Sequence, residues 1–225
     1  MTQSAPDTST PDGDNGRLRP LRGHRLLLAE CFEPLVRIAA WFGVLAGRSR
    51  FPTEMKLRGA LLGGASSGWR IGRNIQFAGA FERFRFGEGV VLYGNTYLDA
   101  HGKAGTVTIG ARSHVDQFCV LYGQGGLSLG PDCAIASGVV IYSQSNQDLL
   151  RDGTPVTRQP PRYAAVRIGD AVWIGAKACI LPGVSIGAGS IVGAGSVVLH
   201  DIPAGSTAYG VPARIAGQRQ RDSAT

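Results

Sequence analysis

Residues 166–198 read VRIGDAVWIGAKACILPGVSIGAGSIVGAGSVV, and an aliphatic residue returns every six positions along this stretch. A small or apolar residue follows each aliphatic residue four positions later. A helix repeats about every 3.6 residues and a strand about every two, so neither element explains the period. The aliphatic positions are Ile168, Ile174, Ile180, Ile186, Val192 and Val198, and their companions are Val172, Ala178, Val184, Ser190, Ser196 and Ile202.

A period of six indicates a solenoid in which each unit is a short strand followed by a corner. The aliphatic residue would point inward, and the next residue would turn the chain. Stacked units would then bury their apolar sides against one another. We expect positive φ angles at the glycines that follow four of the aliphatic residues, because glycine adopts such angles without steric cost. These are Gly169, Gly175, Gly187 and Gly193.

The period extends backward, with small breaks, to Ile71. The whole pattern resembles that of the hexapeptide-repeat acyltransferases. The resemblance implies an all-β fold, a left-handed parallel β-helix of triangular cross-section, and the handedness comes from the resemblance alone. Residues 165–217 are similar to the C-terminal half of sugar O-acetyltransferases such as the maltose and galactoside acetyltransferases. Those enzymes move an acetyl group from acetyl-CoA to a sugar hydroxyl, in a cleft between the subunits of a trimer.

The resemblance therefore implies acetyl-CoA as cosubstrate, a carbohydrate acceptor from surface-polysaccharide or glycolipid biosynthesis, a homotrimer and a cytoplasmic location. Along the chain we expect a disordered basic tail over 1–25, a helical segment over 26–60, the β-helix over 61–210 and a tail over 211–225. Ile141 and Ile168 lie much farther apart than one repeat requires. Residues 143–165 should therefore leave the solenoid as a protruding loop, and long polar loops are commonly functional.

The apolar stretch from Leu26 to Gly47 is a poor transmembrane span, because Glu30, Glu33 and Arg37 interrupt it. Two interpretations of it stay open. It forms a helix that packs across the solenoid end or a neighbouring subunit, or residues 17–50 contact a membrane surface peripherally, with their arginines touching anionic lipid.

Composition excludes several classes of protein. The 225 residues include 33 glycines and are 44% hydrophobic, which fits one turn-rich globular domain. The net charge of +7 gathers near the chain ends without a recognition motif, so we expect no nucleic-acid partner. Cys31, Cys119, Cys133 and Cys179 lack CxxC spacing, so neither a zinc site nor a disulfide framework is expected. A zinc-dependent β-helix carbonic anhydrase would need three metal-binding histidines, and His101 and His114 do not supply that set.

The acceptor side of the expected site departs from the resembling family. Those enzymes place a catalytic histidine after a strand, in a stretch that reads GVVIYSQSN over 138–146 here, so Asn146 stands at the histidine position. An asparagine can orient a substrate but cannot accept a proton at neutral pH. We therefore predict His114 as a replacement base. Asp116 aligns with an acceptor-binding asparagine of the family, and we predict it as the partner. The alternative is that His114 is an ordinary polar corner residue.

Repeat geometry separates His114 from Asn146, because they fall on different corners at an axial offset of roughly 8 Å. Both would face one cleft only if different subunits contributed them.

The donor side matches the family better. Trp173 matches a tryptophan beside the transfer site, and the backbone N–H of Ala176 is a candidate donor to the thioester oxygen. Ala194 and Gly195 match the place where the pantetheine arm passes close to the backbone. Arg214 matches a basic residue near the nucleotide phosphates, and His200 replaces a lysine with that task. Packing, corner geometry or simple surface exposure would also account for each of these residues.

The sequence thus favours an acetyl-CoA-dependent sugar O-acetyltransferase. A sugar N-acetyltransferase stays open because an amine attacks a thioester with less need for a base. A catalytically silent solenoid that binds a partner also stays open, given Asn146.

Overall fold

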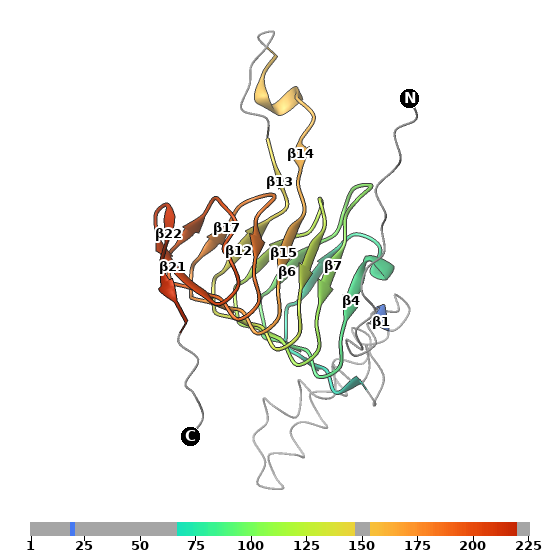
Figure 1. Cartoon of the computed structure of the whole chain (residues 1–225). Coiled ribbons are helices and arrows are strands. Elements are labelled where there is room, and N and C mark those ends of the chain that lie inside the picture. Colours follow the sequence, from blue (N-terminus) through green and yellow to red (C-terminus); the bar gives the residue numbers. More distant parts are fainter. Residues whose placement is uncertain (1–18, 21–66, 147–153, 220–225) are drawn as a thin grey trace, which may run out of the picture.

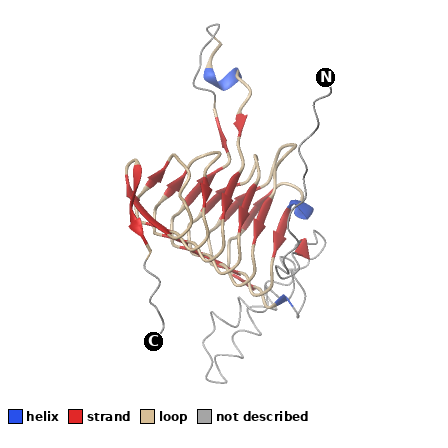
Figure 2. Cartoon of the chain, in the orientation of Figure 1, coloured by secondary structure: helices blue, strands red, loops and turns tan. Residues whose placement is uncertain are grey.

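The structure, a computed structural model, describes residues 19–20, 67–146 and 154–219. These residues form a triangular solenoid whose three faces are sheets of six, eight and six strands (Figure 1). Within the coils, each strand pairs in parallel with the strands of the coils before and after it. Figure 2 shows the described chain as strands and turns with almost no helix. The predicted all-β left-handed parallel β-helix is confirmed.

The three faces are named here A, B and C. Face A contains β1 (Arg19–Pro20), β4 (Phe84–Phe86), β7 (Val107–Ile109), β10 (Leu127–Leu129), β15 (Val166–Ile168) and β18 (Ser185–Ile186). Face B contains β2 (Arg70–Ile71), β5 (Val91–Leu92), β8 (His114–Val115), β11 (Ala134–Ile135), β16 (Trp173–Ile174), β19 (Ile191–Val192), β21 (Ser206–Gly210) and β22 (Ala213–Gln218). Face C contains β3 (Gln76–Ala78), β6 (Tyr97–Asp99), β9 (Val120–Tyr122), β12 (Val140–Tyr142), β17 (Cys179–Ile180) and β20 (Val197–Val198).

The core is one continuous column of inward side chains. All six aliphatic repeat positions are buried, and so are their six companions, including the hydroxyls of Ser190 and Ser196. The first coils carry larger side chains, and Trp69 packs edge-on against Phe86 with ring centroids 5.5 Å apart. The Trp69 indole also donates to the carbonyl of Gly87 at 2.7 Å, so its polar atom is satisfied inside the core.

The repeat glycines act differently from our expectation. The φ angle is not positive at Gly169, Gly175, Gly187 or Gly193. Within the 166–198 repeat, the residues with positive φ are Ala171, Lys177, Gly183, Gly189 and Gly195. The first four glycines are needed for close approach, because a Cβ on Gly175 would lie 2.5 Å from the backbone nitrogen of Ala194 in the next coil. The prediction of positive φ was therefore wrong at these positions, and the lack of a side chain matters there instead.

The coils leave their regular path mainly where face C meets face A. We call this edge the C/A corner; it carries the segments 79–83, 100–106, 123–126, 143–165, 181–184 and 199–201. The longest of them projects away from the solenoid (Figure 1). Its stem pairs β13 (Gln144–Ser145) with β14 (Arg162–Tyr163), and it contains the 3₁₀ helix η3 (Val156–Arg158). Another 3₁₀ helix, η2 (Phe81–Arg83), lies at the same corner.

The helix predicted over 26–60 lies outside the described residues, as does Cys31, and so does the stretch 17–50 apart from Arg19–Pro20. β1 pairs antiparallel with β4. In the part of the chain that the structure describes, no helix has the length and apolar character needed to cross a bilayer. Cys119 and Cys133 are buried and Cys179 is half-buried, all as free thiols.

Candidate functional site

Four of the predicted donor-side residues lie along face B and the edge that follows it, where face B meets face C. Trp173 stands outward on β16 and is 53% exposed. At the following B/C corner, Ala176 accepts a 2.8 Å hydrogen bond from Gly195 in the next coil. The N–H of Ala176 donates to no acceptor among the described residues. Trp173, Ala176, Ala194 and Gly195 are thus close in the fold, and the Ala176 N–H is available to a ligand.

Space for a ligand exists beside Gly195. A Cβ built there would meet no atom of the described chain within 4 Å, and the φ angle of Gly195 is +67°. The backbone at this corner is therefore open to close approach by another molecule.

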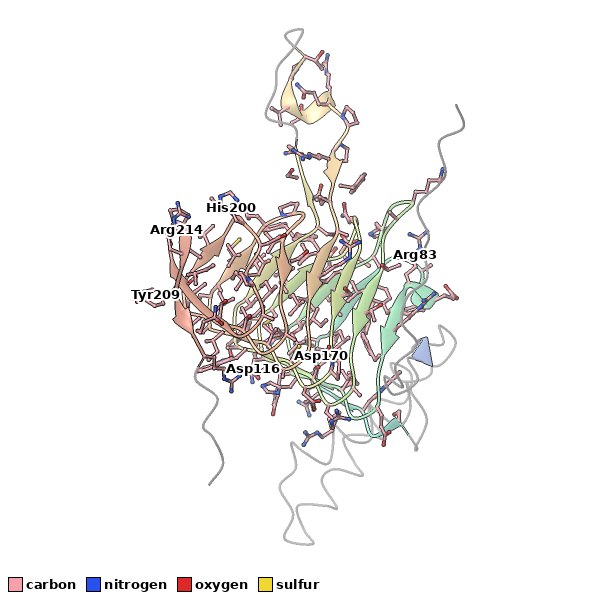
Figure 3. All side chains as sticks on the ribbon, viewed as in Figure 1. Arg83, Asp116, Asp170, His200, Tyr209 and Arg214 are labelled. Carbon is pink, nitrogen blue, oxygen red and sulfur yellow. The ribbon has the colours of Figure 1, made fainter. Side chains whose placement is uncertain are left out.

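His200 and Arg214 lie at the end of the solenoid formed by the last coils (Figure 3). His200 belongs to the segment 199–201 of the C/A corner and is exposed. Arg214 is on β22, in register with Tyr209 of β21, and its Nη1 donates to the carbonyl of Ala213 at 3.1 Å. Its guanidinium is exposed, so most of its donors are free to bind an anion.

The three predicted acceptor-side residues do not form one cluster. His114 is a half-buried outward residue of face B, and Asp116 follows it at the B/C corner. No hydrogen bond joins their side chains, nor does any described residue hydrogen-bond the His114 ring. Asn146 is exposed at the far end of β13, on the stem of the protruding loop. Figure 3 places Asp116 on the side of the solenoid away from that loop.

A polar cluster that the sequence did not suggest lies at the C/A corner. The carboxylate of Asp99, at the end of β6, is only 5% exposed, whereas the side chain of His101 is 62% exposed. Asp99 Oδ1 accepts from the backbone N–H of His101 at 2.8 Å and lies 3.0 Å from its ring Nδ1. Asp99 Oδ2 accepts from Gln124 Nε2 at 2.8 Å and from the Tyr97 hydroxyl at 3.4 Å.

Tyrosines extend this cluster along face C. Asp99, Tyr122 and Tyr142 occupy one outward column, since they are register partners in β6, β9 and β12. The Tyr122 and Tyr142 rings are stacked with centroids 5.0 Å apart. Burial raises the pKa of the Tyr97 phenol, and the nearby Asp99 charge raises it further. Tyr97 therefore keeps its proton and remains a donor to Asp99.

Two other segments hold the loop that carries His101. Nη1 of Arg83 donates to the carbonyls of Ala100, Gly102 and Gly105. The stem of the protruding loop also comes close, because a Cβ built on Gly102 would lie 3.8 Å from the Tyr163 hydroxyl. His101 is therefore an exposed ring on a tethered loop, beside the base of the longest loop in the fold.

Residue spacing could have revealed this pair. Asp99 ends a strand and His101 follows two residues later, which is the spacing at which an aspartate accepts from a backbone N–H in an Asx-turn. Among the described residues, no group of three or more His, Cys, Asp or Glu side chains is placed to hold a metal ion.

Comparison with known proteins gives two family models that match inside the solenoid. Residues 165–200 match the bacterial transferase hexapeptide (six repeats), and residues 107–143 match the hexapeptide repeat of succinyl-transferase. The chain is 34% identical over 137 residues to WbbJ of Escherichia coli K12, a protein named for O-acetyl transfer in lipopolysaccharide biosynthesis. That match covers 58% of this chain and 69% of WbbJ.

Other similarities concern N-acyl transfer. A match of 57 residues at 54% identity covers 25% of this chain and 24% of a 2,3,4,5-tetrahydropyridine-2,6-dicarboxylate N-acetyltransferase from Clostridium perfringens. The chain thus spans about a quarter of that enzyme. Among solved structures, the N-acyltransferase AntD from Bacillus cereus, in complex with dTDP and 3-hydroxybutyryl-CoA, gives a TM-score of 0.60 at 25% identity. The similarity covers 68% of this chain and 81% of AntD.

Proposed function

Because the chain belongs to the hexapeptide-repeat family of bacterial acyltransferases, we propose that it transfers an acetyl group from acetyl-CoA to a hydroxyl of a sugar. The extent of the match to WbbJ supports a hydroxyl rather than an amine as the acceptor. That match covers 58% of this chain, whereas the dicarboxylate N-acetyltransferase match covers 25%. The acceptor would be a sugar nucleotide, a lipid-linked glycan or a polysaccharide unit.

The donor would bind along face B and the B/C corner. Trp173 supplies an exposed aromatic surface beside the thioester, and the Ala176 N–H would stabilise the oxyanion that forms when the carbonyl is attacked. The pantetheine arm would pass over Ala194 and Gly195, where a ligand meets open space. Arg214 would pair with the CoA phosphates, with His200 near them. The coenzyme A complexes of AntD support this assignment of the cosubstrate.

We also propose that the working unit is a homotrimer. Five of the six donor residues lie on face B and the B/C corner, whereas His200, the protruding loop and the exposed His101 ring lie at the C/A corner. One copy cannot bring both edges of the prism to the same acetyl group. A cleft between two copies would unite them, and the exposed Trp173 and Phe118 supply apolar surface for such an interface.

The experiment uses the full-length chain with acetyl-CoA and a panel of sugar acceptors. The panel contains UDP-galactose, UDP-N-acetylglucosamine, GDP-mannose, dTDP-glucose, lipid-linked glycans and surface polysaccharide fragments. Thiol release is followed with a disulfide dye, and mass spectrometry locates an added acetyl group on the sugar. A sugar-dependent rate with an O-acetyl product supports the proposal. A chain that binds acetyl-CoA in calorimetry but releases no thiol with any sugar would be a silent binding protein. Light scattering should give about three times the chain mass of 23.6 kDa.

N-acylation of an amino sugar is the second candidate, and the fold similarity to AntD favours it. A variant of AntD solved with dTDP-4-amino-4,6-dideoxyglucose and coenzyme A aligns with 68% of this chain at a TM-score of 0.60. dTDP-6-deoxyglucose is the matched acceptor, because it shares the nucleotide and the 6-deoxy sugar with this amino sugar and carries a hydroxyl instead of the amine at C4. Faster turnover of the amino sugar, with the acetyl group on nitrogen, would replace the O-acetyl assignment.

A further inference from the structure

We infer that His101, oriented by Asp99, is the general base that removes the acceptor proton during acyl transfer. The inference rests on the proposed function and supplies what Asn146 cannot. A hydroxyl must lose its proton as it attacks a thioester, and a positioned imidazole accelerates such a step by about 10²- to 10⁴-fold. The chain therefore needs a side chain that accepts a proton, is held in place and is open to substrate.

The Asp99–His101 pair fixes one ring nitrogen and leaves the other free. An ionised carboxylate only accepts hydrogen bonds, so the 3.0 Å contact to Asp99 Oδ1 assigns the proton of the neutral ring to Nδ1. Nε2 is then the unprotonated nitrogen, and it contacts no described partner. A buried acid that orients an exposed histidine in this way is the arrangement that activates bases in acyl transfer.

Asp99 is itself held rigidly. Its two oxygens accept from the His101 N–H, from Gln124 and from Tyr97, and the carboxylate is almost fully buried. Backbone, amide and phenol donors on three sides restrict the carboxylate to one orientation. Through Asp99, the direction of the His101 ring is set by β6 and by the neighbouring coil, which carries Gln124.

The loop that presents His101 is also tightly wound. A Cβ on Gly105 would overlap the carbonyl oxygens of Ala100 and His101, and Arg83 bridges three carbonyls of the same loop. The loop lies beside the stem of the protruding loop, since a Cβ built on Gly102 would be 3.8 Å from the Tyr163 hydroxyl. By contrast, no described residue orients the ring of His114. The His101 ring of the Asp99–His101 pair thus has a fixed direction and is exposed. The His114 ring is half-buried, and no described residue fixes its direction.

In the reaction, Nε2 of His101 takes the hydroxyl proton while the acceptor oxygen forms a bond to the thioester carbonyl carbon. The tetrahedral intermediate collapses with cleavage of its C–S bond. The imidazolium returns the proton to the CoA thiolate. The products are the acetyl ester and free CoA, and the dyad ends in its starting protonation state.

A purely structural role is the competing explanation, because an aspartate that accepts from the N–H two residues on also stabilises turns. The test compares His101→Gln and Asp99→Asn with Lys103→Gln, which alters an exposed neighbour in the same loop. With acetyl-CoA and the fastest sugar of the panel, His101→Gln should lower kcat at least about 100-fold. KM for acetyl-CoA and the thermal midpoint should stay near wild type, because the ring is exposed.

The acid side of the pH–rate profile gives a readout that a structural role would not move. Wild type should lose activity on acidification through one ionisation, and His101→Gln should lack that ionisation. Asp99→Asn should lower kcat at least about tenfold by releasing the ring. A His101→Gln enzyme with wild-type kcat and pH profile would overturn the inference.

A second arm needs no acceptor. Nitrogen-15 NMR of the histidine-labelled full chain, with His101 assigned by the signal that His101→Gln lacks, should show that the neutral form of the ring carries its proton on Nδ1. Protonation at Nε2 instead would also overturn the inference. If wild type transfers no acetyl group to any sugar, the proposed function fails while this arm still tests the dyad.

Discussion

His114 and Trp173 lie on the same outer face of the solenoid, on either side of Ala134. Both pair with Ala134 in the sheet, His114 from the preceding coil and Trp173 from the following one. Two strand spacings of about 4.8 Å put their backbones about 10 Å apart. A base must reach the acceptor proton within about 3 Å. His114 could therefore act only on an acceptor that lay between these two side chains. Spacing alone does not favour His101 either, because β6, which precedes it, is three strand spacings from β17.

The His114→Gln variant separates the two candidate bases. We expect its kcat/KM to fall by no more than about tenfold, because no carboxylate among the described residues orients His114, which then contributes at most to acceptor binding. Its pH–rate profile should keep the acid limb of wild type. Steady-state kinetics between mildly acidic and mildly alkaline pH measure both quantities. A loss of about 100-fold together with a missing acid limb would make His114 the base and Asp116 its partner.

Arg214→Gln should weaken acetyl-CoA binding without slowing the chemical step. The guanidinium is exposed on β22, so its ion pair with a phosphate is screened, and we expect KM for acetyl-CoA to rise only about fivefold. Arg167→Gln is the matched control, because Arg167 is an exposed arginine on face A, away from the proposed donor site. Equal KM values for both variants and wild type would remove Arg214 from the phosphate site.

The sequence was sufficient to predict the solenoid because each coil repeats one local arrangement. Six-residue spacing places Ile174 and its counterparts inward regardless of what the rest of the chain does. The role of Gly175 was not predictable in the same way. A one-dimensional pattern shows that a small residue recurs, but only the stacking of coils shows that the backbone of Ala194 fills the space where its side chain would be.

Two glycines of the corner between faces A and B should therefore respond differently to the same substitution. In Gly169→Ala the added Cβ would lie 2.6 Å from the backbone nitrogen of Ala188, and the next coil cannot retreat without breaking its hydrogen bonds. We expect a loss of about 3 kcal/mol in the free energy of unfolding. In Gly189→Ala the Cβ meets nothing within 4 Å, and only the φ of +70° costs energy, about 1 kcal/mol. Denaturant or thermal unfolding measures the difference, and equal losses would contradict the close-approach explanation.

Cys119 should resist alkylation while the protein is folded. Burial raises the pKa of its thiol to about 11, so at pH 8 only about one molecule in a thousand carries the reactive thiolate. Iodoacetamide labelling at pH 8, followed by peptide mass spectrometry, should modify Cys119 far more slowly in the native than in the denatured protein. Half-buried Cys179 serves as the internal comparison and should label faster. Fast native labelling of Cys119 would show that the inward column opens at this coil.

The candidate site was less predictable than the fold, because its parts come from separate coils. His101 lies in a glycine-rich segment of the sequence, and nothing in that segment predicts that Gln124 lies beside Asp99. The parallel register of face C and the winding of the C/A corner bring the two together across one coil. The resembling family has its histidine at the position of Asn146, whereas His101 lies in a different loop of the same corner.

Arg83 offers a test of whether the position of His101 matters as well as its identity. Its guanidinium reaches three carbonyls of the 100–105 loop from η2, and Figure 3 shows Arg83 at the end of the solenoid opposite His200. Arg83→Gln removes this tether while leaving the Asp99–His101 pair intact. A shift of about 1 Å in a catalytic group can cost up to about 100-fold in rate, so we expect kcat to fall about tenfold. KM for acetyl-CoA should not change, and the acid limb should persist because the base is still present.

Arg85→Gln, an exposed substitution on the adjoining β4, controls for the lost charge. Hydrogen exchange of residues 100–105 reports loosening of the loop independently of turnover. A loosened loop with an unchanged kcat would mean that the tether stabilises the corner without serving the chemistry.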